Sequence, residues 1–457
     1  MALMSPVDSV FLLLESREHP MHVGGLSLFT PPEGGGGADL ARSMYNDMVG
    51  VQEVKPLFRR KPQRLLSSFP SISWTTDKDV DLEYHVRLSA LPRPGRIREL
   101  LVLTSRLHGT LLDRHRPLWE AHVIEGLADG RVAVYMKTHH ALIDGVSASQ
   151  VWYRALSPDP DGVFHPPWAP SRPRKSRAPS TAGFSPSGLL AATTRTLRDV
   201  AGIAPATLSS TYQALSDDAA AVPFEAPPSM LNVSITGARR FAAQDWPLAR
   251  LRAVGKNAGA TVNDTVLAMS AGALRRYLLE HDALPEQPLI AMVPVSLRGD
   301  DDGESTGNAV GAVLCNLGTE LSDPAERIAR IHLSMRHSKN VLSGLSPLQS
   351  LAVSVLNIAG MALTPIPGLD RVTGPPFNIV ISNVPGPSEA QYWNGAKLQN
   401  FYPASIPVDG QALNITVTSY ADSMQFGLVG CRRSVPGLQR MLVHLEDALA
   451  ELEKACE

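Results

Sequence analysis

The spacing of apolar and polar residues in the first half of the chain predicts helices separated by short strands. A capping serine followed by proline and an acid, Ser5-Pro6-Val7-Asp8, predicts a helix over residues 5–18, which Pro20 would end. Apolar residues that recur at the helical period predict a second helix over 96–112. Apolar runs next to turn residues predict strands at 21–26, 121–124 and 132–136.

The second half of the chain alternates predicted strands and helices. Helical spacing covers 266–279, 324–342 and 436–454. Apolar runs predict strands at 289–295, 309–317 and 377–381, and a hairpin of 413–418 with 424–429. Strands mixed with helices in both halves predict an α/β protein of the mixed α+β kind.

A change of composition separates the two halves. Residues 157–186 are rich in Pro, Ser and Arg, and a second stretch at 219–229 is rich in Pro and Ala. A helical pattern at 189–200 lies between them. Such stretches are typical of linkers. We therefore expect three parts: an N-terminal domain at 1–156, a crossover linker at 157–229 and a C-terminal domain at 230–457.

Composition narrows the class of protein. The chain has 457 residues, of which 44% are hydrophobic and 19% charged, so it can bury a sizeable core. The formal net charge of −2 argues against nucleic acid as the main partner. Its three cysteines, Cys315, Cys431 and Cys456, are widely spaced. They exclude a disulfide scaffold and a cysteine-based zinc site, and they fit a reducing cytosol.

No segment of the sequence is apolar for the roughly 20 residues that a membrane-spanning helix needs. The nearest candidate, 351–363, is too short and is followed by Pro365 and Pro367. It could line an apolar tunnel, dip into a membrane interface or form an ordinary core helix. The basic cluster of the linker is typical of a solvated segment, with contact to anionic lipid headgroups as the alternative: Arg172, Arg174, Lys175 and Arg177.

The most informative segment is His139-His140-Ala-Leu-Ile-Asp144-Gly145, at the end of the strand predicted over 132–136. A histidine in this position suits a general base, because imidazole takes and returns a proton near neutral pH. Asp144 could hold the turn or pair with an arginine, and Gly145 would permit a positive φ. Adjacent histidines on a strand diverge and no third ligand is evident, so we expect no metal site.

This segment resembles the HHxxxDG signature of the CoA-dependent acyltransferase superfamily, and in particular the bacterial wax ester synthases/diacylglycerol acyltransferases. The resemblance covers about residues 5–450. The other motifs of that family occur in the expected order: the Phe11–Glu15 helix, Met21-His22-Val23-Gly24-Gly25-Leu26, Pro117-Leu118-Trp119, Asn263-Asp264 and Ser382-Asn383-Val384-Pro385-Gly386-Pro387.

The resemblance implies transfer of a long-chain fatty acyl group from acyl-CoA to diacylglycerol, to a long-chain fatty alcohol, or to both. His140 would be the general base for direct attack in a ternary complex, without an acyl-enzyme. His139 would support it. Asp144 would be structural, with Arg298 as a possible partner. No metal or prosthetic group is implied, since acyl-CoA is a substrate.

The resemblance also implies two chloramphenicol-acetyltransferase-like domains with the active-site tunnel between them. Because the acceptor is a lipid, we expect a cytoplasmic protein that attaches peripherally to a membrane or lipid-droplet surface. Two alternatives remain. One is an acyltransferase or condensation enzyme that uses a carrier-protein-bound acyl donor. The other is a lipid-binding homologue without catalytic activity.

The flanking motifs could be structural or could contact the substrate. Asp264 and Thr261 form a capping box, and Asn263 could itself cap the helix that follows. A packed turn before a strand would explain Pro117, Leu118 and Trp119. The Pro and Gly content of the turn predicted over 382–387 fits a rigid structure, but Ser382 and Asn383 could also meet the substrate.

Overall fold

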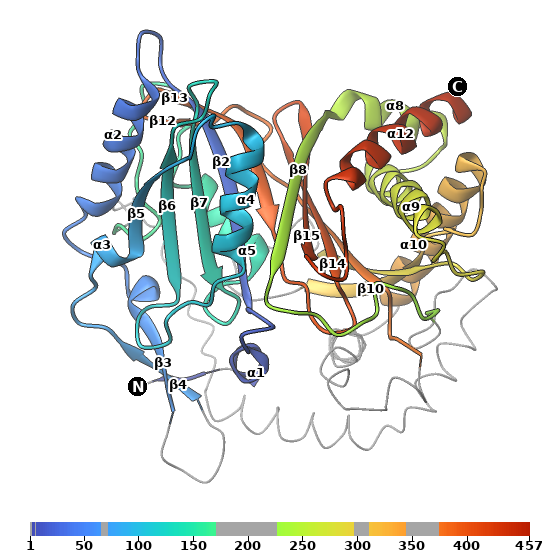
Figure 1. The fold of residues 1–457 in the computed structure, drawn as a ribbon, viewed down its shortest axis with the longest axis horizontal. Helices are drawn as coiled ribbons and strands as arrows, with labels where there is room; N and C mark the ends of the chain where they lie inside the picture. Colours follow the sequence, from blue (N-terminus) through green and yellow to red (C-terminus); the bar gives the residue numbers. More distant parts are fainter. Residues whose placement is uncertain (1, 5, 65–71, 171–225, 297–309, 344–373) are drawn as a thin grey trace.

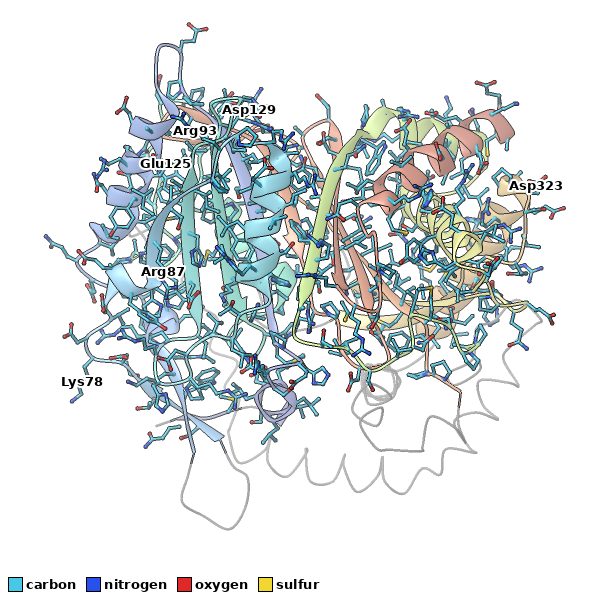
Figure 2. The ribbon with its side chains drawn as sticks, in the orientation of Figure 1. Lys78, Arg87, Arg93, Glu125, Asp129 and Asp323 are labelled. Atoms are coloured by element: carbon cyan, nitrogen blue, oxygen red, sulfur yellow. The ribbon has the colours of Figure 1, made fainter. Side chains whose placement is uncertain are left out.

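The computed structural model describes the chain except for residues 1, 5, 65–71, 171–225, 297–309 and 344–373. Two six-stranded sheets stand side by side, with helices on the outer face of each (Figure 1). Charged side chains project from the outer edges of the molecule. Lys78 lies at the edge of the first domain and Asp323 at the edge of the second (Figure 2).

The first sheet has the order β12-β13-β2-β7-β6-β5, and only β5 and β6 are parallel neighbours. Helix α2 packs on its outer face and α4 on the side that faces the second sheet (Figure 1). The elements of this sheet are β2 (His22–Thr30), β5 (Val86–Ala90), β6 (Trp119–Glu125), β7 (Val132–His139), β12 (Tyr392–Trp393), β13 (Ala396–Ala404), α2 (Gly37–Val49), α3 (Leu82–His85), α4 (Ile97–His108) and α5 (Gly145–Tyr153).

A small antiparallel sheet of order β1-β4-β3 lies at one end of the first domain, beside helix α1 (Figure 1). Its elements are β1 (Ala2–Leu3), α1 (Pro6–Leu14), η1 (Pro56–Arg59), β3 (Arg60–Arg64) and β4 (Ile72–Thr76). The first helix ends four residues earlier than predicted, at Leu14 rather than residue 18. The reason is a local turn, in which the Ser16 hydroxyl accepts the N–H groups of Glu18 and His19.

The second sheet has the order β10-β9-β11-β14-β15-β8, with β11 parallel to both of its neighbours. Helices α8, α9, α10 and α12 cover its outer face (Figure 1). The elements are β8 (Arg239–Pro247), α8 (Leu248–Asn257), α9 (Val262–Glu280), β9 (Ile290–Ser296), β10 (Val310–Asn316), α10 (Pro324–Ser343), β11 (Ile379–Val384), β14 (Leu413–Tyr420), β15 (Ser423–Cys431) and α12 (Arg440–Ala455). The predicted hairpin is confirmed as β14 and β15.

The predicted division of the chain at residue 230 does not hold for β12 and β13. These strands belong to the C-terminal half of the sequence, yet β13 pairs with β2 and extends the first sheet. Gly25 on β2 makes this pairing possible, because a Cβ there would lie 2.4 Å from the Phe401 ring. The C-terminal half therefore contributes two strands to the first sheet, and the two halves do not form separate units.

The described part of the predicted linker is packed as well. Phe164 stacks on Trp393 with 3.4 Å between ring centroids, and Trp168 is fully buried. Burial of two large aromatic side chains outweighs the flexibility that the Pro-rich composition suggests. The helix predicted at 189–200, the basic cluster at 172–177 and the apolar segment 351–363 lie outside the described residues.

Buried apolar residues from both sheets meet around α4 and β13 and join the domains into one structure. They include Leu26, Leu100, Tyr135, Phe241, Tyr402 and Val429. The two sheets pack closely at Gly427 of β15. A Cβ at this glycine would lie 1.8 Å from the carbonyl oxygen of Pro403 on β13.

We expect Gly427→Ala to lower the free energy of unfolding by about 1–3 kcal/mol, because the added methyl group forces the two sheets apart. Urea unfolding followed by tryptophan fluorescence would measure this. Gly430→Ala is the matched control on the same strand, since the nearest atom to its Cβ is 3.4 Å away. Equal losses for both variants would mean that the contact at Gly427 does not hold the sheets together.

Candidate active site

Strand β7 delivers two adjacent histidines to its C-terminal end. The backbone N–H of His139 donates to the carbonyl of Leu118 (3.0 Å), and that of His140 donates to the carbonyl of Met21 (2.9 Å). The chain is therefore held, at the point where β7 ends, by the residues directly before β6 and β2. As predicted from the alternation of a strand, the two rings have different surroundings.

The His139 ring is fully buried and bonded within the protein. Its Nδ1 accepts the N–H of Ala141 (3.0 Å), so the proton of the neutral ring is on Nε2. Nε2 lies 3.3 Å from Oε1 of Glu15. Because both nitrogens face protein groups, this geometry suits the supporting role expected for His139.

Glu15 is a site residue that motif reasoning did not single out. Its side chain is 1% exposed, and its carboxylate accepts Arg114 Nε (2.9 Å) and the N–H of Met21 (3.2 Å). Burial acts to raise the pKa of Glu15, but His139, Arg114 and Met21 together lower it below its usual range. The only signal in the sequence was its place at the end of the Phe11–Glu15 motif.

His140 is half-buried, and its ring stacks on Phe11 with 4.1 Å between centroids and 23° between planes. Within the described part of the chain, no side chain of another residue is hydrogen-bonded to this ring. Burial lowers the pKa of His140 to about 4, with a smaller opposing effect from Asp144. The ring is therefore neutral at pH 7, with a nitrogen available to accept a proton.

Asp144 caps the helix that follows the histidines. Its Oδ1 accepts the N–H of Ser147 (2.9 Å) and its Oδ2 the hydroxyl of the same residue (2.7 Å). The proposed partner Arg298 lies outside the described residues. The positive φ predicted for Gly145 is wrong, because Gly145 is the first residue of the right-handed helix α5.

The Asn263-Asp264 motif lies on the first turn of α9. The predicted capping box is confirmed: Asp264 Oδ2 accepts the N–H of Thr261 (2.9 Å), and Thr261 Oγ1 accepts that of Asp264 (3.2 Å). Asp264 also lies 2.8 Å from Nδ1 of His332 on α10. Asn263 Oδ1 accepts the side-chain N–H of Asn383 at 3.2 Å, so the structure brings two separate motifs together.

Loss of the cap should be measurable as a loss of stability. We expect Thr261→Ala to lower the free energy of unfolding by about 1 kcal/mol, because the N–H of Asp264 loses its acceptor. Thr261→Ser retains a hydroxyl and should keep most of the stability in urea unfolding. A serine variant as unstable as the alanine variant would show that the methyl group of Thr261 matters more than the hydrogen bond.

Part of the turn predicted over 382–387 is in fact strand. Ser382 and Asn383 belong to β11 and pair with Thr416 and Val417 of β14. The strand ends at Val384 because Pro385 has no N–H to continue the ladder. The following Gly386 passes close to β14, where a Cβ would lie 2.2 Å from the carbonyl of Ser419.

Leu118 and Trp119 have no exposed surface. Trp119 stacks on Trp168 and on His85, each at 4.4 Å between ring centroids, and its indole N–H donates to the carbonyl of Phe58 (2.9 Å). The N–H of Trp119 also donates to the carbonyl of Pro117. These contacts favour packing over the predicted contact of Pro117, Leu118 and Trp119 with substrate.

Within the described ranges of the chain, no three or more His, Cys, Asp or Glu side chains gather in a way that could hold a metal ion. No helix in the described part of the chain has the length and apolar character to cross a bilayer.

Comparison with family models places both halves of the chain in one family. Residues 4–266 match the wax ester synthase/diacylglycerol acyltransferase catalytic domain, and residues 306–453 match the C-terminal domain of the same family. A Mycobacterium tuberculosis protein named "Probable diacylglycerol O-acyltransferase tgs2" is 55% identical over 457 residues, which cover 100% of this chain and 99% of the relative.

Solved structures agree with the family models. The wax ester synthase/diacylglycerol acyltransferase from Marinobacter aquaeolei VT8 superposes with a TM-score of 0.78 at 42% identity, over 100% of both chains. The first condensation domain of the calcium-dependent antibiotic synthetase superposes with a TM-score of 0.58 at 16% identity, over 99% of this chain and 96% of that one. The second match shows a shared fold alone, and it confirms the expected fold class.

Proposed function

Because the chain belongs to the wax ester synthase/diacylglycerol acyltransferase family and is an acyltransferase, we propose that it moves a long-chain fatty acyl group from acyl-CoA to diacylglycerol, to a long-chain fatty alcohol, or to both. The observation that carries this proposal is the state of His140. Its ring is neutral at pH 7, is held from the backbone and from one face, and has an unused nitrogen.

In the proposed reaction, His140 takes the hydroxyl proton as the alcohol oxygen bonds to the thioester carbonyl carbon. The tetrahedral oxyanion then collapses, the carbon–sulfur bond breaks, and the proton passes from His140 to the CoA thiolate. General-base catalysis of this kind contributes roughly 10²–10⁴-fold. The acceptor attacks directly, so no acyl-enzyme forms, and no metal or prosthetic group takes part.

Both substrates would meet between the two domains. Helix α5 starts just after the histidines and ends at Tyr153, whose hydroxyl would lie 3.2 Å from a Cβ at Gly386 in the second domain. The motifs of the two halves are thus near one another around α5. A dry site at this position would favour the alcohol over water as the acceptor.

The lipid nature of the acceptor also suggests where the enzyme works. Diacylglycerol and long-chain alcohols partition into lipid, so we propose peripheral attachment to a membrane or lipid-droplet surface, on the cytoplasmic side. The enzyme would draw the acceptor from the lipid surface and acyl-CoA from solution.

CoA thiol release by the purified protein tests the proposed function. Palmitoyl-CoA would be supplied with no acceptor, with hexadecanol or with a diacylglycerol. Release that depends on the acceptor, with the ester found as product, is the expected result, and the faster acceptor names the main product. Folded protein that releases no CoA with either acceptor would overturn the proposal in favour of a carrier-bound donor or a lipid-binding role.

A further inference from the structure

Helix α1, together with Glu15 directly after its last residue, contacts both histidines of the site from outside the two sheets. Figure 1 shows it beyond the ends of the long strands of the first domain. Phe11 stacks on His140 and Glu15 faces His139, and the two lie one helical turn apart, with the N–H of Glu15 donating to the carbonyl of Phe11 (3.1 Å).

We propose that α1 is a positioning arm for the catalytic base, in which Glu15 sets the ring of His139 and the backbone of His140, while Phe11 sets the ring plane of His140. This inference rests on the proposed function, in which His140 is the base. Phe11 and Glu15 are positioning residues, since they act through the histidines and not on the substrate.

The first part of the arm is a chain of hydrogen bonds. Glu15 accepts the N–H of Met21, and the carbonyl of Met21 accepts the N–H of His140. The same carboxylate faces Nε2 of His139, whose Nδ1 holds the N–H of Ala141. One buried carboxylate therefore orients His139 directly and Ala141 through the His139 ring. It does not contact the His140 ring, which is left free to react.

The second part is the anchor of α1. Arg114 donates to the Glu15 carboxylate and also to the carbonyls of Leu12 (2.8 Å) and Glu15 (3.4 Å) at the end of the helix. A guanidinium that satisfies these last carbonyls fixes the helix end where Glu15 must lie. It also neutralises a carboxylate that burial would otherwise disfavour.

The third part is the stack on His140. At 4.1 Å and 23°, the Phe11 ring covers one face of the imidazole and excludes water from it. The titratable groups around this imidazole are Asp144 on its own turn and His139 beside it, with His22 of β2 paired to His139 across the strands. The other face and the ring edge are the parts left for the substrate hydroxyl.

The experiment compares Phe11→Ala, Phe11→Tyr and Glu15→Gln with Val10→Ala, an exposed position on the same helix (42% exposed). The rate constant kcat/KM for palmitoyl-CoA with the better acceptor would be followed from about pH 3 to 8, a range that includes the parent pKa of His140 at about 4. The His140 ring of each free enzyme would also be titrated by NMR, with the resonance assigned from His140→Ala.

For Phe11→Ala we expect the acid limb of the profile and the NMR midpoint of His140 to move up by a pH unit or more, toward the ordinary value of about 6.5. The tyrosine variant should restore both. For Glu15→Gln we expect kcat to fall by about 10²-fold, because the base is misplaced, with the KM for palmitoyl-CoA nearly unchanged. Val10→Ala should behave as the parent.

The proposal is overturned if Phe11→Ala and Glu15→Gln lower only the unfolding temperature and leave the pH profile, the NMR midpoint and kcat of the folded fraction unchanged. In that case α1 would be a purely structural helix. Failure of the proposed function is a separate result. A parent enzyme without acceptor-dependent CoA release would still show, through the NMR titration, whether Phe11 controls the His140 ring.

Discussion

His140→Ala should lower acceptor-dependent CoA release by about 10²–10⁴-fold, the usual contribution of a general base. The expected loss is large because no neighbouring side chain among the described residues is free to take over the proton. The His139 ring is fully buried, with one nitrogen on the N–H of Ala141 and the other facing Glu15. Asp144 is engaged by both donors of Ser147 at the start of α5.

Measurements of the fold and of KM on the same variant separate loss of catalysis from loss of structure. Among the aromatic rings of the described residues, only Phe11 packs on the His140 ring. Removal of that ring should therefore leave the fold intact and the KM for palmitoyl-CoA within a few-fold of the parent. Circular dichroism and thermal unfolding would check the fold. A folded His140→Ala variant that retains more than about a tenth of the parent rate would assign the proton transfer to a different group.

The sequence predicts the local elements well, because helix and strand periods are properties of short segments. The spacing over 266–279 anticipates α9, and the apolar run at 132–136 anticipates the strand that delivers His140. The histidine pair was also recognisable, since the motif is contiguous. The positive φ expected at Gly145 shows the limit of local rules, because the Asp144 cap starts a helix there.

Contacts between distant segments were beyond sequence reasoning. No strand is predicted at 396–404, and nothing local tells that this segment joins the sheet of the other half, as β13 does. Glu15 and Arg114 lie 99 positions apart, so their ion pair has no spacing signal. Trp168 was assigned to a linker from its Pro- and Arg-rich surroundings, although a tryptophan in such a run is itself a sign of burial.

The role of Pro117-Leu118-Trp119 can be decided by Trp119→Ala, which should lower the free energy of unfolding by about 3–5 kcal/mol. The variant loses a fully buried indole, its stacks on Trp168 and His85, and its hydrogen bond to the carbonyl of Phe58. Urea unfolding at 25 °C would measure the change. Trp119→Phe, which retains a ring and loses the hydrogen bond, should lose clearly less.

Activity measured at low temperature tests whether Trp119 also contacts the substrate. The N–H of His139 donates to the carbonyl of Leu118, so a disordered motif would also release the end of β7. If the motif only packs, the folded fraction of Trp119→Phe should have the parent KM for palmitoyl-CoA and for the acceptor. If a variant of Trp119 instead has the stability of the parent and a strongly raised KM, then Trp119 contacts the substrate and the packing interpretation is wrong.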